Sequence, residues 1–159
     1  MGTSMHRIDL VVEAGLGSAA ALALEALSRA LERGGFSVGS DDPQMTIRVG
    51  SLADVSACDV LQAAGVSCQD VPESVAVAFA DRTLAIVGSD ERGLAYGVRD
   101  AARRIDGVSG PVDWSATFPA VSETPFLRKL RHGDKKRIGG HQVRRLVPER
   151  QAERIKSIG

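Results

Sequence analysis

Short apolar runs bounded by polar or glycine-rich segments predict the β-strands of this chain. Four such runs occur, at residues 8–12, 45–50, 74–80 and 83–88. Each has the length of an ordinary strand and is rich in Val, Ile, Leu or Ala. The last two runs are separated only by Asp81 and Arg82, a spacing typical of an antiparallel hairpin.

Two longer segments carry apolar residues at helical spacing. The first covers residues 18–33, and the second begins near Asp90 and runs to about Ile105. Successive steps of 4, 3 and 4 residues place the apolar side chains on one face of each helix. These residues are Ala20, Leu24, Leu27 and Leu31 in the first segment, and Leu94, Val98, Ala101 and Ile105 in the second. The order of elements predicts an α/β (α+β) fold: two helices packed on a mixed sheet containing an antiparallel hairpin.

The pattern is weaker in two regions. Residues 51–73 are mixed, and we expect only a short helix near residues 59–64. We expect residues 114–125 to be irregular, because Pro119 and Pro125 limit any helix there.

The turn after the first strand resembles a dinucleotide-binding fingerprint. Gly15 and Gly17 begin the string G-x-G-x-x-A between a strand and a helix, which is the context that such a motif requires. Asp41 and Asp42 follow at a distance suited to a ribose-binding acid. Against this, residues 36–42 make a poor second strand, and an antiparallel hairpin is foreign to the doubly wound fold. A nucleotide-dependent enzyme using this turn stays open as an alternative.

Asp90 and Glu91 are adjacent carboxylates, a pair that invites an acid/base interpretation. Neighbouring residues of a helix point about 100° apart and do not share a site. We therefore interpret Asp90 as the N-cap of the second helix, and Glu91 as a charge that the helix dipole favours there.

Gly93 and Gly97 lie one turn apart in the same helix, although glycine costs about 1 kcal/mol relative to alanine in a helix interior. Together they predict a smooth strip that lets the helix lie close to the sheet or to a partner. We expect Tyr96, between them, to be a buried anchor whose hydroxyl finds a partner.

Charge divides the chain into two regions. Residues 1–127 hold 9 Lys and Arg against 17 Asp and Glu, a net charge of −8, whereas residues 128–159 hold 11 against 3, a net charge of +8. A basic tail can bind nucleic acid, which is a second alternative function, but this one lacks interleaved aromatic residues and any known nucleic-acid-binding module. Aromatic residues make up only 4% of the chain, which disfavours sites built on stacking.

Cysteine and histidine indicate neither a metal centre nor a nucleophile. Cys58 and Cys68 have no zinc-type spacing, and we interpret them as small buried hydrophobic residues. No recognisable nucleophile motif lies near His6, His132 or His141. No signal peptide or membrane span is readable, and we expect a cytoplasmic protein.

A strand followed by D-x-R-G-x-x-Y-G at the head of an amphipathic helix resembles the N-terminal accessory domain of certain glycoside hydrolases. The group includes bacterial beta-N-acetylhexosaminidases and alpha-glucuronidases. The motif residues are Asp90, Arg92, Gly93, Tyr96 and Gly97. The first strand, the first helix and the strand TIRVG also match the layout of that domain, and the resemblance covers about residues 6–128.

The resemblance implies a non-catalytic α/β sandwich that packs against a catalytic barrel or another protein partner. After Pro125 only 34 residues remain, whereas a barrel needs about 250. We therefore expect an accessory domain at residues 6–127 and a basic tail at residues 128–159. The chain would then be a truncated gene product or an independent descendant. It would have no glycosidase activity of its own, no catalytic residue and no cofactor or metal.

Overall fold

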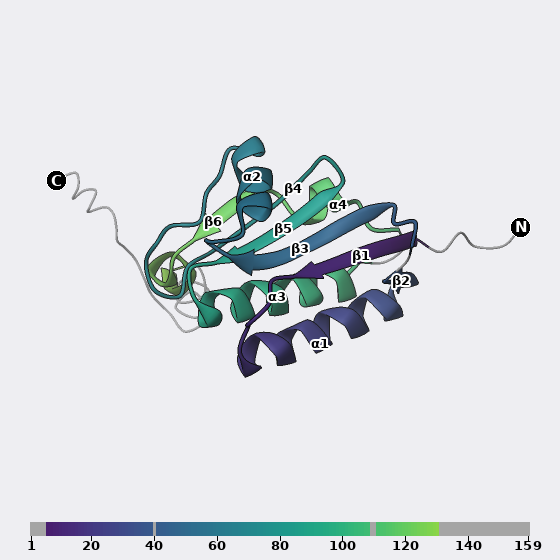
Figure 1. Cartoon of the computed structure of the whole chain (residues 1–159), viewed down its shortest axis with the longest axis horizontal. Helices are drawn as coiled ribbons and strands as arrows, with labels where there is room; N and C mark the ends of the chain where they lie inside the picture. Colours follow the sequence, from purple (N-terminus) through teal and green to yellow (C-terminus); the bar gives the residue numbers. More distant parts are fainter. Residues whose placement is uncertain (1–5, 40, 109–110, 131–159) are drawn as a thin grey trace, which may run out of the picture. The chain divides into compact units, whose positions relative to one another are not determined.

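A six-stranded mixed sheet with helices on both faces forms the part of the chain that ends at Pro125 (Figure 1). The computed structural model describes residues 6–39, 41–108 and 111–130. A second unit begins at Phe126, and its described residues, 126–130, are helical. The strands are β1 (His6–Val12), β2 (Phe36–Val38), β3 (Met45–Ser51), β4 (Val75–Ala80), β5 (Thr83–Gly88) and β6 (Val121–Glu123). The helices are α1 (Ser18–Arg33), α2 (Val55–Ala63), α3 (Glu91–Asp106) and α4 (Trp114–Thr117).

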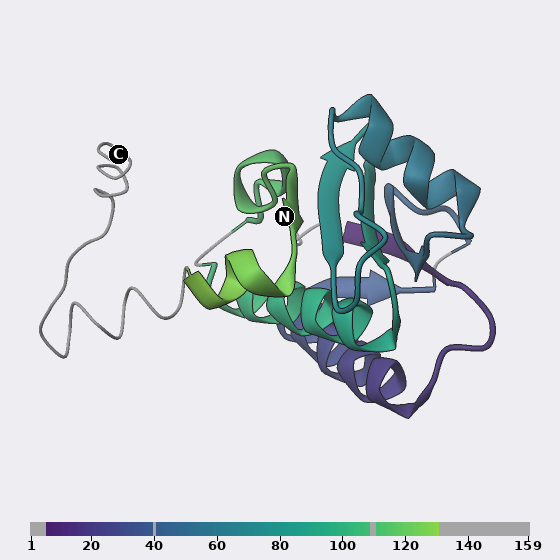
Figure 2. The ribbon, with the colours of Figure 1, turned by 90° about the vertical axis from the view of Figure 1, so that its left-hand side faces the viewer.

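The strand order confirms the predicted fold class. The strands follow one another across the sheet as β2-β1-β3-β5-β4-β6. Pairing is parallel from β2 to β5, and β4 is antiparallel to both β5 and β6. Helices α1 and α3, the two helices predicted to pack on the sheet, lie side by side on one face, while α2 covers the other face (Figures 1 and 2).

Alternate residues of the strands point to opposite faces of the sheet, and each face has its own hydrophobic core. In β4, Val75 and Val77 face α1 and α3, whereas Ala76 and Ala78 face α2. Because successive strand residues point to opposite faces, a strand buried on both sides needs an unbroken apolar run. The core under α1 and α3 holds the larger side chains, and the core under α2 consists mostly of alanine and valine.

The predicted hairpin is confirmed, with Ala80 paired to Thr83 across a two-residue turn. Asp81 and Arg82 have φ values of 54° and 60°, as a type I′ turn requires. Most hairpins of this kind place glycine at the second of these positions, so an arginine there carries a conformational cost.

Two segments are more ordered than the sequence predicted. Helix α2 begins at Val55, four residues before the expected start, because the Asp54 side chain accepts a hydrogen bond from Ala57 N at 3.2 Å. The region expected to be irregular contains both α4 and β6. Asp113 caps α4 in the same way, through Ala116 N at 3.3 Å.

The expectation that residues 36–42 form a poor strand was partly wrong. Residues 36–38 form β2, which pairs in parallel with the start of β1, and Phe36 is buried. The ring of Trp114 packs at 5.5 Å from Phe36 and at 5.7 Å from Phe118, measured between ring centroids. This long-range aromatic contact, which no local pattern reveals, holds the three-residue strand in place.

Candidate functional site

The motif at the head of α3 closes around the start of β4. Asp90 is the N-cap of α3, as predicted, since its Oδ1 accepts from Gly93 N at 2.9 Å. Its Oδ2 accepts from the backbone N–H of Glu73, two residues before β4, at 3.0 Å. The hydrogen bond from Gly93 N is the main reason why the pKa of Asp90 lies below its ordinary value. Asp90 therefore acts as a structural carboxylate that joins a helix to a strand.

Arg92 and the two glycines extend this junction along β4. The guanidinium group of Arg92, whose side chain is 81% exposed, pairs with Glu73 Oε2 at 3.2 Å. A Cβ on Gly93 would overlap the carbonyl oxygen of Ser74, and a Cβ on Gly97 would lie 2.5 Å from Val75 Cγ2. The two glycines therefore let α3 approach β4 closely, as the sequence predicted for this strip.

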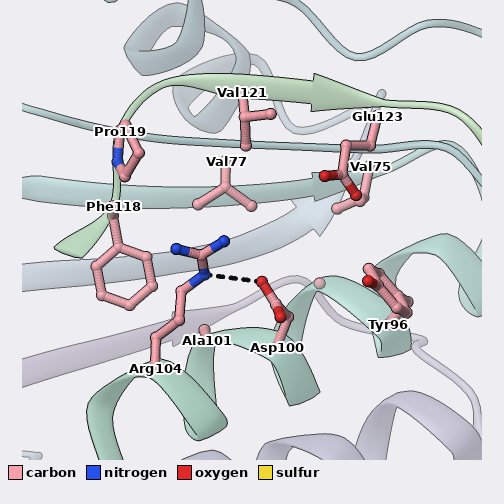
Figure 3. A pocket seen from close by; sticks show the side chains of 11 residues that line it. Val75, Val77, Tyr96, Asp100, Ala101, Arg104, Phe118, Pro119, Val121 and Glu123 are labelled. Carbon is pink, nitrogen blue, oxygen red and sulfur yellow. Dashed lines mark hydrogen bonds and ion pairs between the residues drawn. The ribbon is translucent and has the colours of Figure 1, made fainter. Parts of the chain in front are cut away.

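Tyr96 does not fulfil its predicted role as a buried anchor. Its side chain is half-buried and lines a groove between α3 and the β4–β6 edge of the sheet. Residue 96 lies to one side of the strip that faces the sheet, so its ring reaches the border of the core instead of its centre (Figure 3).

The groove has an apolar floor and charged walls (Figure 3). Its charged residues are Asp100 and Arg104 on α3 and Glu123 on β6, of which Glu123 is only 9% exposed. Arg104 Nε donates to Asp100 Oδ2 at 2.9 Å, and Arg104 also donates to the carbonyl of Thr117 at 3.2 Å. The space open to the centre of a water-sized sphere is about 20 Å³, close to what one water molecule needs.

Sequence reasoning missed this groove. Asp100 and Arg104 have an i, i+4 relation that any exposed helix can show, and Glu123 lies in a segment expected to be irregular. The sequence offered no usable signal, because Val121, Ser122 and Glu123 do not alternate between apolar and polar and three residues are too few to indicate a strand.

The carboxyl ends of β1 and β3 form the place where an open α/β sheet usually binds a ligand, because the chain departs there in two directions. Here the Glu13 side chain lies between the strand ends. It accepts hydrogen bonds from Ser51 N at 2.6 Å and from Ser51 Oγ at 3.1 Å. This crevice is therefore filled by a carboxylate of the chain.

Open α/β folds can also bind an anion at the N-terminus of the first helix. Here a carboxylate of the chain itself occupies that position. Glu91 Oε2 accepts from Ala19 N at 2.7 Å, and a Cβ on Gly17 would overlap the Glu91 carboxylate. Glu91 thus serves α1 as well as α3, a role that the sequence did not suggest. Gly15 has φ of +84° and makes the turn that brings α1 back over the sheet. This arrangement argues against nucleotide binding at the Gly15–Gly17 turn.

Among the described residues, the other candidates do not come together as a metal or catalytic site. Asp42 pairs with Arg7 at the far end of β1, at 3.6 Å. Cys58 and Cys68, interpreted from the sequence as small buried hydrophobic residues, are free thiols that lie half-buried against the core under α2, and burial raises the pKa of Cys68 to about 11. His132 and His141 lie outside the described residues, as does most of the basic tail.

Two further findings concern the part of the chain that the structure describes. No group of three or more His, Cys, Asp or Glu side chains there is arranged to hold a metal ion. None of its helices combines the length and the apolar character that crossing a membrane requires.

No protein-family model and no curated protein matches the chain. Solved structures with a similar fold include a GH138 enzyme targeting pectin rhamnogalacturonan II, at 22% identity and a TM-score of 0.51 over 74% of this chain. CpGH84D matches at 13% identity and a TM-score of 0.53 over 65% of this chain. These two matches cover 12% and 18% of the larger chains, so the chain shares its fold with a small part of each. BtGH115A, a GH115 4-O-methyl-alpha-glucuronidase with specificity for decorated arabinogalactans, matches at 20% identity and a TM-score of 0.49, over 67% of this chain and 14% of its own.

Proposed function

We propose that residues 6–127 are a non-catalytic accessory domain of the kind found in glycoside hydrolases, and that the domain packs against a catalytic barrel or another protein partner. The observation that carries the proposal is the shared fold, which occupies less than a fifth of the chain of two glycoside hydrolases, a GH138 enzyme and CpGH84D. A fold that recurs as a small part of large enzymes is more consistent with a supporting module than with their catalytic machinery.

The chemistry of the described carboxylates supports the same proposal. Glycosidases use two carboxyl groups on either side of a cleft that admits a sugar. Asp90, Glu91 and Glu13 instead accept hydrogen bonds from the backbone. Asp100 and Glu123 do line a groove, but that groove has room for about one water molecule, and Asp100 is paired with arginine.

The test is a glycosidase assay of the purified full chain with a panel of nitrophenyl glycosides, including a glucuronide and an N-acetylglucosaminide. We expect no turnover above the buffer control. Turnover that persists through repeated purification and is abolished by Glu123→Gln would show that the domain is itself catalytic. The matched control is Glu25→Gln, which changes an exposed carboxylate on α1, far from the groove in sequence.

A second measurement addresses the partner. If the coding sequence beside this chain encodes a barrel, the two polypeptides should elute together in size-exclusion chromatography after co-expression. Separate elution of two folded proteins at micromolar concentration would contradict the proposed packing.

A further inference from the structure

The arginines of the acidic part of the chain are concentrated on one helix. Residues 1–127 contain nine basic residues, all of them arginine, within a net charge of −8. Four of the nine belong to α3, at positions 92, 99, 103 and 104. The other five are distributed over α1, β1, β3 and the hairpin turn.

Three of these arginines, Arg92, Arg99 and Arg103, form a line along the exposed side of α3. We name these three residues the arginine stripe. Steps of 7 and 4 residues bring them within about 40° of one another around the helix axis. Their Cα atoms span 11 residues, or about 16 Å. All three are exposed, and the side chains of Arg92 and Arg103 are 81% and 63% accessible.

Two neighbouring carboxylates orient the ends of the arginine stripe without neutralising it. Glu73 pairs with Arg92 at 3.2 Å, and Asp100 pairs with Arg103 at 3.1 Å. Arg99, in the middle, makes no hydrogen bond or ion pair with the described residues. With Arg104, α3 carries four arginines against the three carboxylates Glu91, Asp100 and Asp106, so the helix has a net charge of +1 in a region whose total is −8.

We propose that the arginine stripe is a docking surface for a protein partner that presents a row of carboxylates. The planar guanidinium pairs with carboxylates through two parallel hydrogen bonds, which a lysine cannot do. Arginine is also among the residues enriched at the energetic centres of protein interfaces, where lysine is depleted. A helix with charged groups at positions i, i+7 and i+11 matches a partner helix whose Asp or Glu residues recur at the same spacing.

The complementarity is local, since the rest of this region would repel an acidic partner. The stripe therefore also fixes the orientation of docking. A polysaccharide partner is less well supported, because Tyr96 is the only aromatic residue of α3 and is half-buried. This inference does not depend on the proposed accessory role.

The experiment uses the full chain and a fluorescein-labelled oligoglutamate peptide, with binding measured by fluorescence anisotropy at low ionic strength. Two charge reversals are compared: Arg99→Glu in the stripe and Arg29→Glu on the exposed side of α1. Both change the net charge by the same amount, and both retain the basic tail, so any contribution of the tail is common to them.

We expect Arg99→Glu to weaken binding about tenfold and Arg29→Glu to weaken it less than about twofold. Added salt should reduce the difference between the two variants. Equal losses would overturn the proposal, because they would show that only net charge matters. Polygalacturonate provides the second arm: binding that is sensitive to Arg99 with this polymer, and absent with oligoglutamate, would overturn the proposal in favour of an acidic glycan.

Folding of the variants is checked by thermal denaturation. Arg99 has no partner to lose among the described residues, so the melting temperature of Arg99→Glu should match that of the parent. Arg99→Gln removes the charge without reversing it and should give an intermediate loss of binding. A loss as small as that of Arg29→Glu would contradict the proposal.

Discussion

The Oε2 atom of Glu91, the first residue of α3, lies 2.7 Å from the backbone nitrogen of Ala19 in the first turn of α1. Helix α1 has no side-chain cap of its own, because its N-cap residue is Gly17. The two helices run parallel, so their N-termini, which carry the positive ends of the helix dipoles, lie together. The carboxylate of Glu91 therefore stabilises both N-termini. A residue of one helix thus replaces the cap that the other lacks.

Replacing Glu91 should destabilise the domain through α1 as well as α3. We expect Glu91→Ala to lower the free energy of unfolding by about 1–2 kcal/mol, the usual cost of losing an N-cap. Urea denaturation followed by circular dichroism measures the change. Glu25→Ala is the matched control, because this exposed glutamate lies on α1 and makes only a surface pair with Arg29 at 3.9 Å. Its effect should stay within about 0.5 kcal/mol, and equal effects of the two substitutions would contradict the capping role.

The two glycines of α3 should differ in their tolerance of a methyl group. Gly93→Ala places a Cβ against the backbone carbonyl of Ser74, which can move only if β4 moves. Gly97→Ala meets methyl groups of Val75 and Ile86, which can shift more easily. We expect Gly93→Ala to cost about 2–3 kcal/mol and Gly97→Ala less, with Gly97→Leu again more severe.

Gly107→Ala is the control for these substitutions, since its Cβ would meet only ordinary contacts at the end of α3. Thermal denaturation should show the smallest fall in melting temperature for Gly107→Ala and a larger one for Gly97→Ala. The falls for Gly93→Ala and Gly97→Leu should each exceed that of Gly97→Ala. Wild-type melting of Gly93→Ala would mean that α3 does not pack on β4 as closely as described.

The hairpin turn offers a stabilising substitution. Arg82 has φ of 60°, a left-handed conformation that costs a residue with a side chain about 1 kcal/mol. Arg82→Gly should raise the melting temperature by a few degrees, although the greater freedom of glycine in the unfolded chain offsets part of the gain. Arg82→Ala removes the charge but keeps the Cβ, and should bring no comparable gain. If both variants melted alike, the cause would be charge and not backbone conformation.

Stability should depend on pH through Asp90. The hydrogen bond from Gly93 N holds the pKa of this carboxyl below its ordinary value of about 3.9 in the folded state. The ionised form therefore stabilises the fold fully above pH about 4, and this contribution is lost as the pH falls through the lower folded pKa. Denaturation midpoints measured between neutral and acid pH should fall less steeply in Asp90→Asn than in the parent. The control is Asp41→Asn, because Asp41 makes no hydrogen bond or ion pair with the described residues, and its profile should follow the parent.

The sequence predicted the long elements well because their patterns are local. An apolar face every three or four residues defined α1 and α3, and two apolar runs with a two-residue gap defined the hairpin. The short elements β2, α4 and β6 were missed because three or four residues carry too little periodicity. Their positions are set by distant contacts, such as the packing of Trp114 on Phe36.

The sequence predicted only part of the motif at the head of α3, because some of its contacts are local and others join distant parts of the chain. The Asp90 cap depends on a residue three positions away, which the sequence displays directly. The second role of Glu91 depends on Ala19, 72 positions away, and no spacing rule connects the two. Tyr96 was misplaced because its burial depends on where the edge of the sheet ends, which is fixed by β6.

Two links join α1 to α3, Glu91 to Ala19 at one end and Arg33 to Asp106 at 2.7 Å at the other, and they connect positions 72 and 73 residues apart. During synthesis on the ribosome, α1 is complete long before either partner has emerged. Its apolar face, with Leu27 and Leu31, then has no α3 to pack against. Contacts of such long range slow folding, since the chain between them must be closed before they form. We therefore expect a nascent chain that stops before residue 91 to have no protected core, and the domain to fold only after α3 has been released from the ribosome.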